Sequence, residues 1–243
     1  MLLKSDHLKS SHGFFTREGG FSSGEYAGLN CGFGSGDERD IVQRNRDTVL
    51  QSLGGKKLVT AYQIHSDITH VVSGCEDKLE GDALVTNKAG IAIGVLTADC
   101  TPILFEDNKA GVIGAAHAGW KGARFGIISS VIRAMQNLGA QNITAVVGPC
   151  IQATSYEVRE DFAAVFASES PKNSEFFTKT EKDGHLMFNL PAYVEMKLRK
   201  NGIEHIEIIK EDTLTQPEKF YSFRRTTLAG KKDYGRQISA ICL

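Results

Sequence analysis

Three side chains that are typical metal ligands stand near the ends of apolar runs. Cys100 follows the apolar run 91–98, and His117 is the penultimate residue of the run 111–118. Near-continuous apolar runs of this length predict buried strands. A third candidate, His65, follows another predicted strand. Two imidazoles and one thiolate fill three positions of a tetrahedral zinc site and leave the fourth open, as in catalytic zinc sites.

A predicted β-hairpin places two of these side chains on the same side of a sheet. Residues 102–110 are typical of a strand followed by a four-residue turn, which pairs Glu106 with Gly111 and brings Cys100 opposite His117. Facing residues have Cβ atoms about 4.5–5.5 Å apart, close enough for one metal ion to bind both side chains. A register shift of two residues preserves the shared side, whereas a shift of one abolishes it.

The chemistry of this trio admits several alternatives. The wide spacing of His65, Cys100 and His117 along the chain matches no compact zinc-finger pattern. The same ligands bind copper at least as tightly as zinc. Cys100 and a histidine also suit a metal-free nucleophilic pair. Asp99, next to Cys100, is a candidate for a carboxylate that orients a ligand, for a general base, or for the cap of a turn.

Three cationic residues are candidates for binding phosphate. Lys121 lies in the motif Ala-Gly-Trp-Lys-Gly after His117, where a helical pattern begins and continues to a stop at Gly139. Helix starts bind anions, although the two glycines also permit a tight turn. Arg17 lies among glycines, and Arg224 begins an arginine pair after a predicted aromatic strand. Guanidinium forks match phosphate oxygens, but a solvated arginine or an ion pair is the ordinary alternative.

The composition is that of an ordinary globular protein. The 243 residues are 41% hydrophobic and 23% charged, with a net charge of −1, so no basic field indicates a nucleic-acid partner. No apolar run approaches the roughly 20 residues needed to span a bilayer, and the N-terminus lacks a signal-peptide core. The five cysteines are odd in number and show no CxxC spacing. We therefore expect a cytoplasmic protein whose cysteines are thiols or ligands, with no membrane partner.

Predicted helices and strands are interspersed along the whole chain. Helices are predicted at residues 37–53, 125–138, 155–166 and 191–200, and a surface loop at residues 169–184. Further strands are predicted at residues 58–63, 68–72, 143–147, 186–188, 206–209, 220–223 and 237–242. No repeat or flexible linker divides the chain, so we expect one domain over residues 1–243. The predicted strands and helices are interspersed without regular βαβ alternation, which favours a layered α+β fold with a mixed β-sheet core flanked by helices.

Several motifs together resemble those of a known family. They are Leu-Thr-Ala-Asp-Cys-Thr-Pro at 96–102, Ala-His-Ala-Gly-Trp-Lys-Gly at 116–122, Gln-Ile-His at 63–65, Gly-Pro at 148–149, His-Gly-Phe-Phe-Thr-Arg at 12–17 and Tyr-Ser-Phe-Arg-Arg at 221–225. In type and order they resemble the YfiH/DUF152 family, which carries the label multicopper polyphenol oxidase or laccase domain. The resemblance spans nearly the whole chain.

This resemblance implies an activity and a set of ligands. It implies a purine nucleoside phosphorylase that cleaves adenosine, inosine, guanosine and methylthioadenosine with phosphate and also deaminates adenosine. The family's metal triad falls on His65, Cys100 and His117 and implies Zn²⁺, with copper as the alternative. The implied fold is a single α/β domain, not a cupredoxin sandwich. For this activity we assign phosphate to the cations Lys121 and Arg224, with Arg17 or Arg225 in reserve.

Other functions remain open at this point. The chain has seven histidines and no His-x-His pair, too few for the several coppers of a true multicopper oxidase. A copper-dependent polyphenol oxidase, a metal-free Cys/His hydrolase and a non-catalytic metal-binding module are the alternatives. The chain also departs from the family pattern: Lys121 replaces a usual arginine, Asp212 a usual cysteine, and Cys150 a usual alanine. These departures bear on substrate preference more than on the class of reaction.

Overall fold

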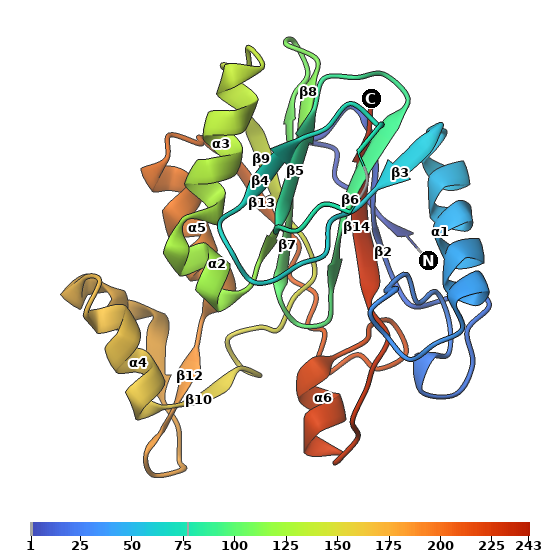
Figure 1. Ribbon diagram of the computed structural model, residues 1–243. Helices are drawn as coiled ribbons and strands as arrows, with labels where there is room; N and C mark the ends of the chain where they lie inside the picture. Colours follow the sequence, from blue (N-terminus) through green and yellow to red (C-terminus); the bar gives the residue numbers. More distant parts are fainter. Residues whose placement is uncertain (1, 77) are drawn as a thin grey trace.

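The computed structural model describes residues 2–76 and 78–243 (Figure 1). Its strands are β1 (Leu2–Leu3), β2 (Ser11–Phe15), β3 (Lys57–Val59), β4 (Thr69–Val71), β5 (Ala83–Thr86), β6 (Ile91–Thr97), β7 (Thr101–Asp107), β8 (Val112–Ala118), β9 (Thr144–Val147), β10 (Glu157–Arg159), β11 (Phe177–Lys179), β12 (His185–Phe188), β13 (His205–Ile208) and β14 (Gln237–Cys242). Its helices are η1 (Gly24–Tyr26), α1 (Arg39–Leu53), α2 (Trp120–Phe125), α3 (Ile127–Asn137), α4 (Glu160–Ala167), η2 (Pro171–Phe176), α5 (Leu190–Lys200) and α6 (Phe223–Leu228). In this part of the chain no helix is long and apolar enough to cross a bilayer.

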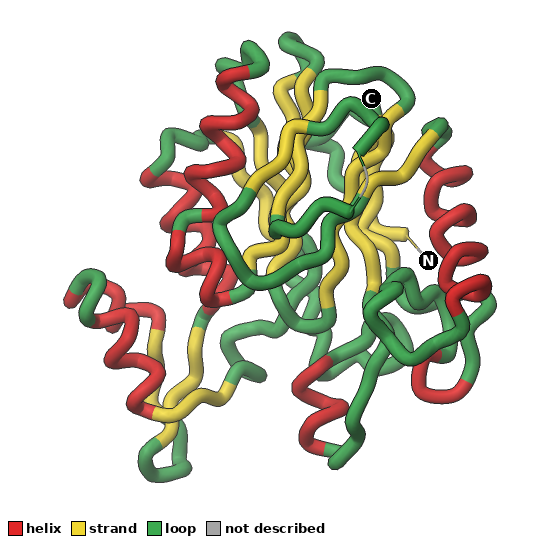
Figure 2. Tube along the Cα trace, in the orientation of Figure 1, coloured by secondary structure: helices red, strands yellow, loops and turns green. Residues whose placement is uncertain are grey.

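Two β-sheets packed face to face form the centre of the molecule. One has the strand order β13-β9-β7-β8-β5-β4 and the other β1-β2-β14-β6-β3. Helices α3 and α5 cover the outer face of the first sheet, and α1 covers the second (Figures 1 and 2). Parallel and antiparallel pairs occur in both sheets. The predicted α+β fold with a mixed sheet core flanked by helices is therefore confirmed.

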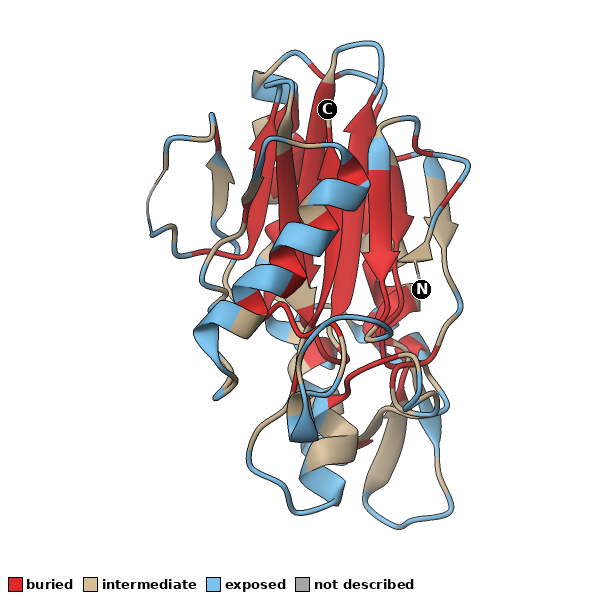
Figure 3. Cartoon of the chain, turned by 90° about the vertical axis from the view of Figure 1, so that its right-hand side faces the viewer, coloured by how far each residue is buried: buried red, intermediate tan, exposed pale blue. Residues whose placement is uncertain are grey.

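Successive side chains of each strand point to opposite faces of its sheet, which divides the core into separate apolar layers. In β7, Ile103 and Phe105 pack toward α3 and α5, whereas Leu104 packs between the two sheets. In β6, Val95 packs between the sheets and Leu96 against the layer beneath α1. Figure 3 shows the central strands buried and the outward side of α1 exposed. Because both faces of each sheet are covered, the central strands read as continuous apolar runs in the sequence.

The hairpin of β7 and β8 has a register two residues away from the predicted one. Glu106 pairs with Ile113, not with Gly111, and Pro102 lies opposite His117. The difference arises because Asp107 remains in β7 and accepts hydrogen bonds from two turn amides, which moves the four-residue turn one position along the chain. A register shift of two residues keeps each side chain on the same side of the sheet, so Cys100 and His117 still lie on one side.

Several predicted elements differ from those observed. The helix predicted at residues 125–138 is broken into α2 and α3 by Gly126, which has φ of +117°. The segment 155–166 contains strand β10 before α4, because β10 pairs with β12. The predicted loop 169–184 contains η2 and β11, and no strand forms at residues 220–223. Strand β14 has the predicted bounds, and the helix predicted from residue 37 begins at Arg39.

Candidate metal centre

The three predicted ligands meet at one end of the layer between the sheets. His117 lies on β8, Cys100 immediately precedes β7, and His65 lies in the connection between β3 and β4. Their ligand atoms all lie within 4.8 Å of one another. The Cys100 Sγ atom is 3.8 Å from His65 Nε2, and the two imidazole rings meet edge to face. The structure thus brings together residues from three separate segments of the chain.

One buried carboxylate, Asp82, positions both histidines. Its Oδ1 atom lies 2.8 Å from His117 Nδ1 and accepts a hydrogen bond of 3.0 Å from the His65 amide. Its Oδ2 atom accepts hydrogen bonds from the amide and the hydroxyl of Ser66, at 2.6 and 2.7 Å. Because Nδ1 of His117 faces this carboxylate, Nε2 is the nitrogen left to bind a metal ion. Sequence reasoning missed Asp82, although a lone acid between Gly81 and the apolar strand β5 was a usable signal.

His65 adopts a backbone conformation that is unusual for a residue with a side chain. Its φ is +61°, in the left-handed region. Such a conformation persists only where surrounding contacts hold it, and here the Asp82 carboxylate accepts hydrogen bonds from the amides of residues 64 to 66. The strained turn presents the His65 ring to Cys100 from outside the sheet.

The charges in this cluster favour a thiolate. Burial alone raises the pKa of Cys100, but His117 and His65 outweigh it and lower the pKa to about 6. Burial likewise lowers the pKa of His117, yet Cys100 and the bond to Asp82 raise it to about 9. Burial opposes ionisation of Asp82, whereas the bonds from His117 and Ser66 lower its pKa to about 2. The thiolate is the form of cysteine that binds metals.

The geometry of the donor set fits a tetrahedral metal ion. Zn–S and Zn–N bonds of about 2.3 and 2.0–2.1 Å place sulfur and nitrogen about 3.5 Å apart in a tetrahedral site. The 3.8 Å between Cys100 Sγ and His65 Nε2 is close to that value. Three protein ligands leave one position open toward the cavity that His65, Cys100 and His117 line. Copper accepts the same ligands, so the donor set alone does not separate the two metals.

Gly119 makes room for the cluster. A Cβ atom at this position would lie 2.9 Å from the His65 ring and 3.1 Å from Cys100 Sγ. The glycine therefore permits the close approach of His65 and Cys100. Helix α2 has only six residues, and the Lys121 ammonium lies 5.6 Å from the Trp120 ring centroid.

Replacing Gly119 with alanine is expected to weaken metal binding about 10–100-fold, as happens when residues that support metal ligands are changed. The added methyl group would push His65 away from Cys100, while the strands of both sheets are untouched. Gly34→Ala is the matched control, because a Cβ at Gly34 meets nothing within 4 Å. Zinc affinity measured by competition with a chelator checks the prediction, and equal affinities in the two variants would contradict it.

The cations predicted to bind phosphate do not line the cavity at the triad. Arg17 donates to the carbonyls of Ala27 and Pro217. Arg224 donates to the carbonyl of Glu157 and lines a separate cavity of about 410 Å³. Lys121 is exposed on α2. Their role in phosphate binding stays a prediction, and the contacts of Arg17 and Arg224 are those of structural residues.

Asp99 lies beside the cluster but touches neither histidine. Its carboxylate accepts hydrogen bonds from Thr213 Oγ1, Ser222 Oγ and the Arg224 amide, at 2.7, 2.9 and 2.6 Å. Burial raises its pKa, against the effect of those bonds. Among the roles considered for Asp99, the structure supports that of a cap. It ties the segment before Cys100 to the N-terminus of α6, and Asp82 has the orienting role.

The cavity next to the triad has a volume of about 730 Å³. This is in the range of small-molecule sites, about 300–1,000 Å³. Besides His65, Cys100 and His117, its lining includes Thr97 at the end of β6 and Phe33 from the loop before α1. The site therefore combines a cavity of small-molecule size with three side chains that can bind a metal ion.

The chain is similar to known proteins over most of its length. Residues 11–243 match the family described as multi-copper polyphenol oxidoreductase laccase. A protein of Rickettsia conorii named purine nucleoside phosphorylase is 36% identical over 207 residues, which cover 80% of this chain and 85% of that protein. A purine nucleoside phosphorylase of Deinococcus radiodurans is 37% identical over 228 residues, covering 92% and 87%.

Solved structures with the same fold are also known. A DUF152 protein of Neisseria meningitidis has a TM-score of 0.88 at 30% identity and covers 100% of this chain and 98% of its own. A hypothetical protein YfiH of Bacillus licheniformis has a TM-score of 0.86 at 29% identity, covering 96% and 92%. The match over nearly the whole length shows that this chain belongs to the multi-copper polyphenol oxidoreductase laccase family, which includes the DUF152 and YfiH proteins.

Proposed function

We propose that this protein is a zinc-dependent purine nucleoside phosphorylase that acts on adenosine, inosine, guanosine and methylthioadenosine, with adenosine deamination as a second activity. The observation that carries the proposal is the cluster of His65, Cys100 and His117 on the wall of the cavity. The names of relatives that match over most of the chain support the reaction class. The free cysteines fit a cytoplasmic location, which we also propose.

The proposed reaction transfers a sugar from a purine to phosphate. An oxygen of hydrogen phosphate bonds to the anomeric carbon as the bond from that carbon to the purine nitrogen breaks. The electron pair leaves with the purine, which also receives the proton from hydrogen phosphate, so the products are a sugar 1-phosphate and the free base. The transition state has positive charge on the sugar and negative charge on the purine, so the site must stabilise both.

The protein's own residues hold the three proposed metal ligands in position for this chemistry. Asp82 holds His117 with Nε2 toward the cluster, and the same carboxylate fixes the turn that presents His65. Cys100 supplies a thiolate, because its two histidine neighbours lower its pKa to about 6 against the effect of burial. A bound zinc ion supplies a Lewis acid and lowers the pKa of a coordinated water, which is the chemistry that deamination of adenosine requires.

A single metal cluster argues against phenol oxidation by several coppers. Within the described residues, His65, Cys100 and His117 form the one group of three or more metal-capable side chains close enough to share an ion. The activity in the family's description needs several copper sites acting together. We therefore favour a zinc site with an open position over a polyphenol oxidase.

Incubation of the purified protein with inosine and phosphate tests this proposal. We expect hypoxanthine and ribose 1-phosphate to form in equal amounts, and neither to form when phosphate is omitted or after the metal is removed by a chelator. Adenosine without phosphate should yield inosine. A zinc-loaded, folded protein that forms no hypoxanthine from inosine, guanine from guanosine or adenine from adenosine and methylthioadenosine would overturn the proposal.

A further inference from the structure

Arg46 is a buried charge with no carboxylate partner among residues 2–76 and 78–243. It lies on α1, is only 6% exposed, and burial lowers its pKa. Its guanidinium donates to the Cys31 carbonyl and to Thr60 Oγ1, at 3.1 and 2.9 Å. Guanidinium has five N–H donors, and no ion pair to Arg46 is found in the described part of the chain. Burying an unpaired charge is strongly unfavourable, and Arg46 lines the cavity, so an anion there would compensate for it.

A second arginine contacts the same aromatic side chain as Arg46 and lines the same cavity. Arg39 lies two helical turns before Arg46 on α1, on the same side of the helix. The two guanidinium carbons lie 4.6 and 4.8 Å from the centroid of the Phe33 ring. The ring contacts both cations by cation–π interactions, and both side chains line the cavity. Guanidinium groups match the oxygens of an oxyanion, so two of them on the lining of one cavity suit such a ligand.

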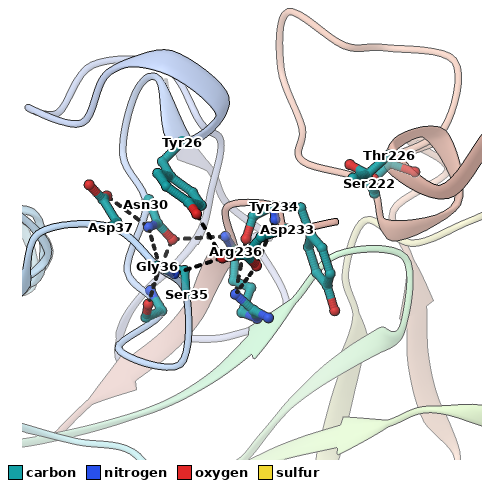
Figure 4. A network of polar contacts seen from close by, with 11 residues as sticks. Tyr26, Asn30, Ser35, Gly36, Asp37, Ser222, Thr226, Asp233, Tyr234 and Arg236 are labelled. Atoms are coloured by element: carbon teal, nitrogen blue, oxygen red, sulfur yellow. Dashed lines mark hydrogen bonds and ion pairs between the residues drawn. The ribbon is translucent and has the colours of Figure 1, made fainter. Parts of the chain in front are cut away.

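Arg236, a third arginine, completes this wall of the cavity. It lies over the Tyr234 ring, donates to the Tyr234 carbonyl and forms an ion pair of 3.7 Å with Asp233, so its charge is already partly compensated. The Asp233 carboxylate accepts hydrogen bonds from Tyr26 Oη and the Gly36 amide, at 2.7 and 2.6 Å. Figure 4 shows this network, which joins the loop before α1 to the segment before β14. The wall is therefore tied together by contacts that do not use up the charges of Arg39 and Arg46.

Charge is unevenly distributed over the cavity. The cations on its lining are Arg39, Arg46, Lys57, Lys78 and Arg236, whereas its acids are Glu76 and Glu80. The lining also includes Thr97, whose hydroxyl is buried and has no hydrogen-bond partner. An excess of positive charge and an unused hydroxyl in one cavity favour a ligand with several acceptor oxygens.

We propose that Arg46 and Arg39, with Arg236 beside them, form the binding site for inorganic phosphate in the cavity. This inference rests on the proposed function, because it assigns the second substrate of phosphorolysis. It places that substrate in the same cavity as His65, Cys100 and His117, which Lys121, Arg17 and Arg224 do not line. Bidentate contacts from guanidinium to phosphate oxygens are short and roughly twice as strong as neutral hydrogen bonds.

The test compares Arg39→Gln and Arg46→Lys with Arg44→Gln. Arg44 is an exposed arginine on the same helix whose guanidinium lies over Phe21, away from the cavity lining. Arg46→Lys keeps the positive charge but loses the planar guanidinium group and its paired donors. Arg39 is exposed, so its replacement leaves no cavity in the core. Two quantities are measured: the KM for phosphate at saturating inosine, and direct binding of inorganic phosphate by calorimetry at constant ionic strength.

We expect both cavity variants to bind phosphate about tenfold more weakly or worse, as the loss of a charge-assisted bond requires. The KM for inosine and the zinc content should stay near the values of the unaltered protein, and Arg44→Gln should change neither measurement. Unchanged phosphate affinity in both cavity variants would overturn the proposal, as would an equal loss in Arg44→Gln. Inosine monophosphate serves as a second probe: if it alone binds through these arginines and inorganic phosphate does not, the assignment to inorganic phosphate is wrong.

The two proposals can fail separately. If the unaltered protein binds inorganic phosphate, loses it on Arg39→Gln, and yet cleaves no nucleoside, the phosphate site stands and the proposed reaction is wrong. If it cleaves inosine with phosphate and both cavity variants keep the same phosphate KM and affinity, the reaction stands and the site proposed here is wrong.

Discussion

Replacing Cys100 with serine is expected to remove zinc and to lower both phosphorolysis and deamination by at least about 100-fold. Changes to residues that only support metal ligands cost about 10–100-fold, and loss of a ligand should cost no less. The Cys100 sulfur lies 3.8 Å from His65 Nε2, within a group of ligand atoms no more than 4.8 Å apart. A serine hydroxyl does not ionise at neutral pH, so the variant lacks the anionic ligand.

The control for this prediction is Cys75→Ser. Cys75 is exposed and lies outside both cavities described above, so its loss should leave zinc content and activity unchanged. Elemental analysis of protein purified without added metal gives the zinc per chain, and kcat/KM is measured for inosine with phosphate and for adenosine alone. A Cys100→Ser protein that retains stoichiometric zinc and full activity would show that the metal, if any, binds elsewhere.

The meeting of Cys100 and His117 was predictable because it depends on a short-range pattern. Cys100 immediately precedes β7 and His117 lies near the end of β8, the two strands are joined by a tight turn, and the strand period of two decides which side of the sheet each side chain takes. The predicted register was two residues away from the observed pairing, yet the side was right. His65 was reached only by its chemistry, since its place beside Cys100 depends on a left-handed turn held by Asp82.

Residues outside the cluster were harder to predict because their roles arise from tertiary contacts. Arg46 looks like any arginine of an amphipathic helix until α1 packs on the sheet and buries it. The phosphate role of Arg224 stays a prediction, and the sequence could not show that its guanidinium donates to the Glu157 carbonyl in the folded chain. The break at Gly126 was missed for a different reason: apolar spacing continues through α2 and α3, although the backbone there leaves the helical region.

The segment 155–166 shows how a helical pattern can conceal a strand. The segment was predicted as one amphipathic helix, and its aromatic residues Tyr156, Phe162 and Phe166 belong to a single aromatic cluster. The first residues form β10 because β12 supplies a partner strand about thirty residues later. Long-range pairing of this kind overrides local propensity and cannot be read from one segment.

Replacing Asp82 with asparagine is expected to lower zinc affinity about 10–100-fold and to destabilise the fold by about 1–3 kcal/mol. Asparagine has nearly the same shape, but it loses the negative charge and replaces one acceptor oxygen with a donor. The carboxylate is buried and serves His117 Nδ1, the His65 amide and the Ser66 amide together. At least one of these groups would be left without an acceptor, and the His117 ring would lose the partner that fixes its orientation.

Asp99→Asn is the matched control for this substitution, because Asp99 is a second buried carboxylate next to Cys100 that bonds neither histidine. Both variants should lower the free energy of unfolding measured in urea. Zinc affinity, measured by competition with a chelator, should fall in Asp82→Asn and remain near its original value in Asp99→Asn. The reverse result, with zinc lost from Asp99→Asn and retained by Asp82→Asn, would mean that the histidines are oriented by their packing and not by the carboxylate between them.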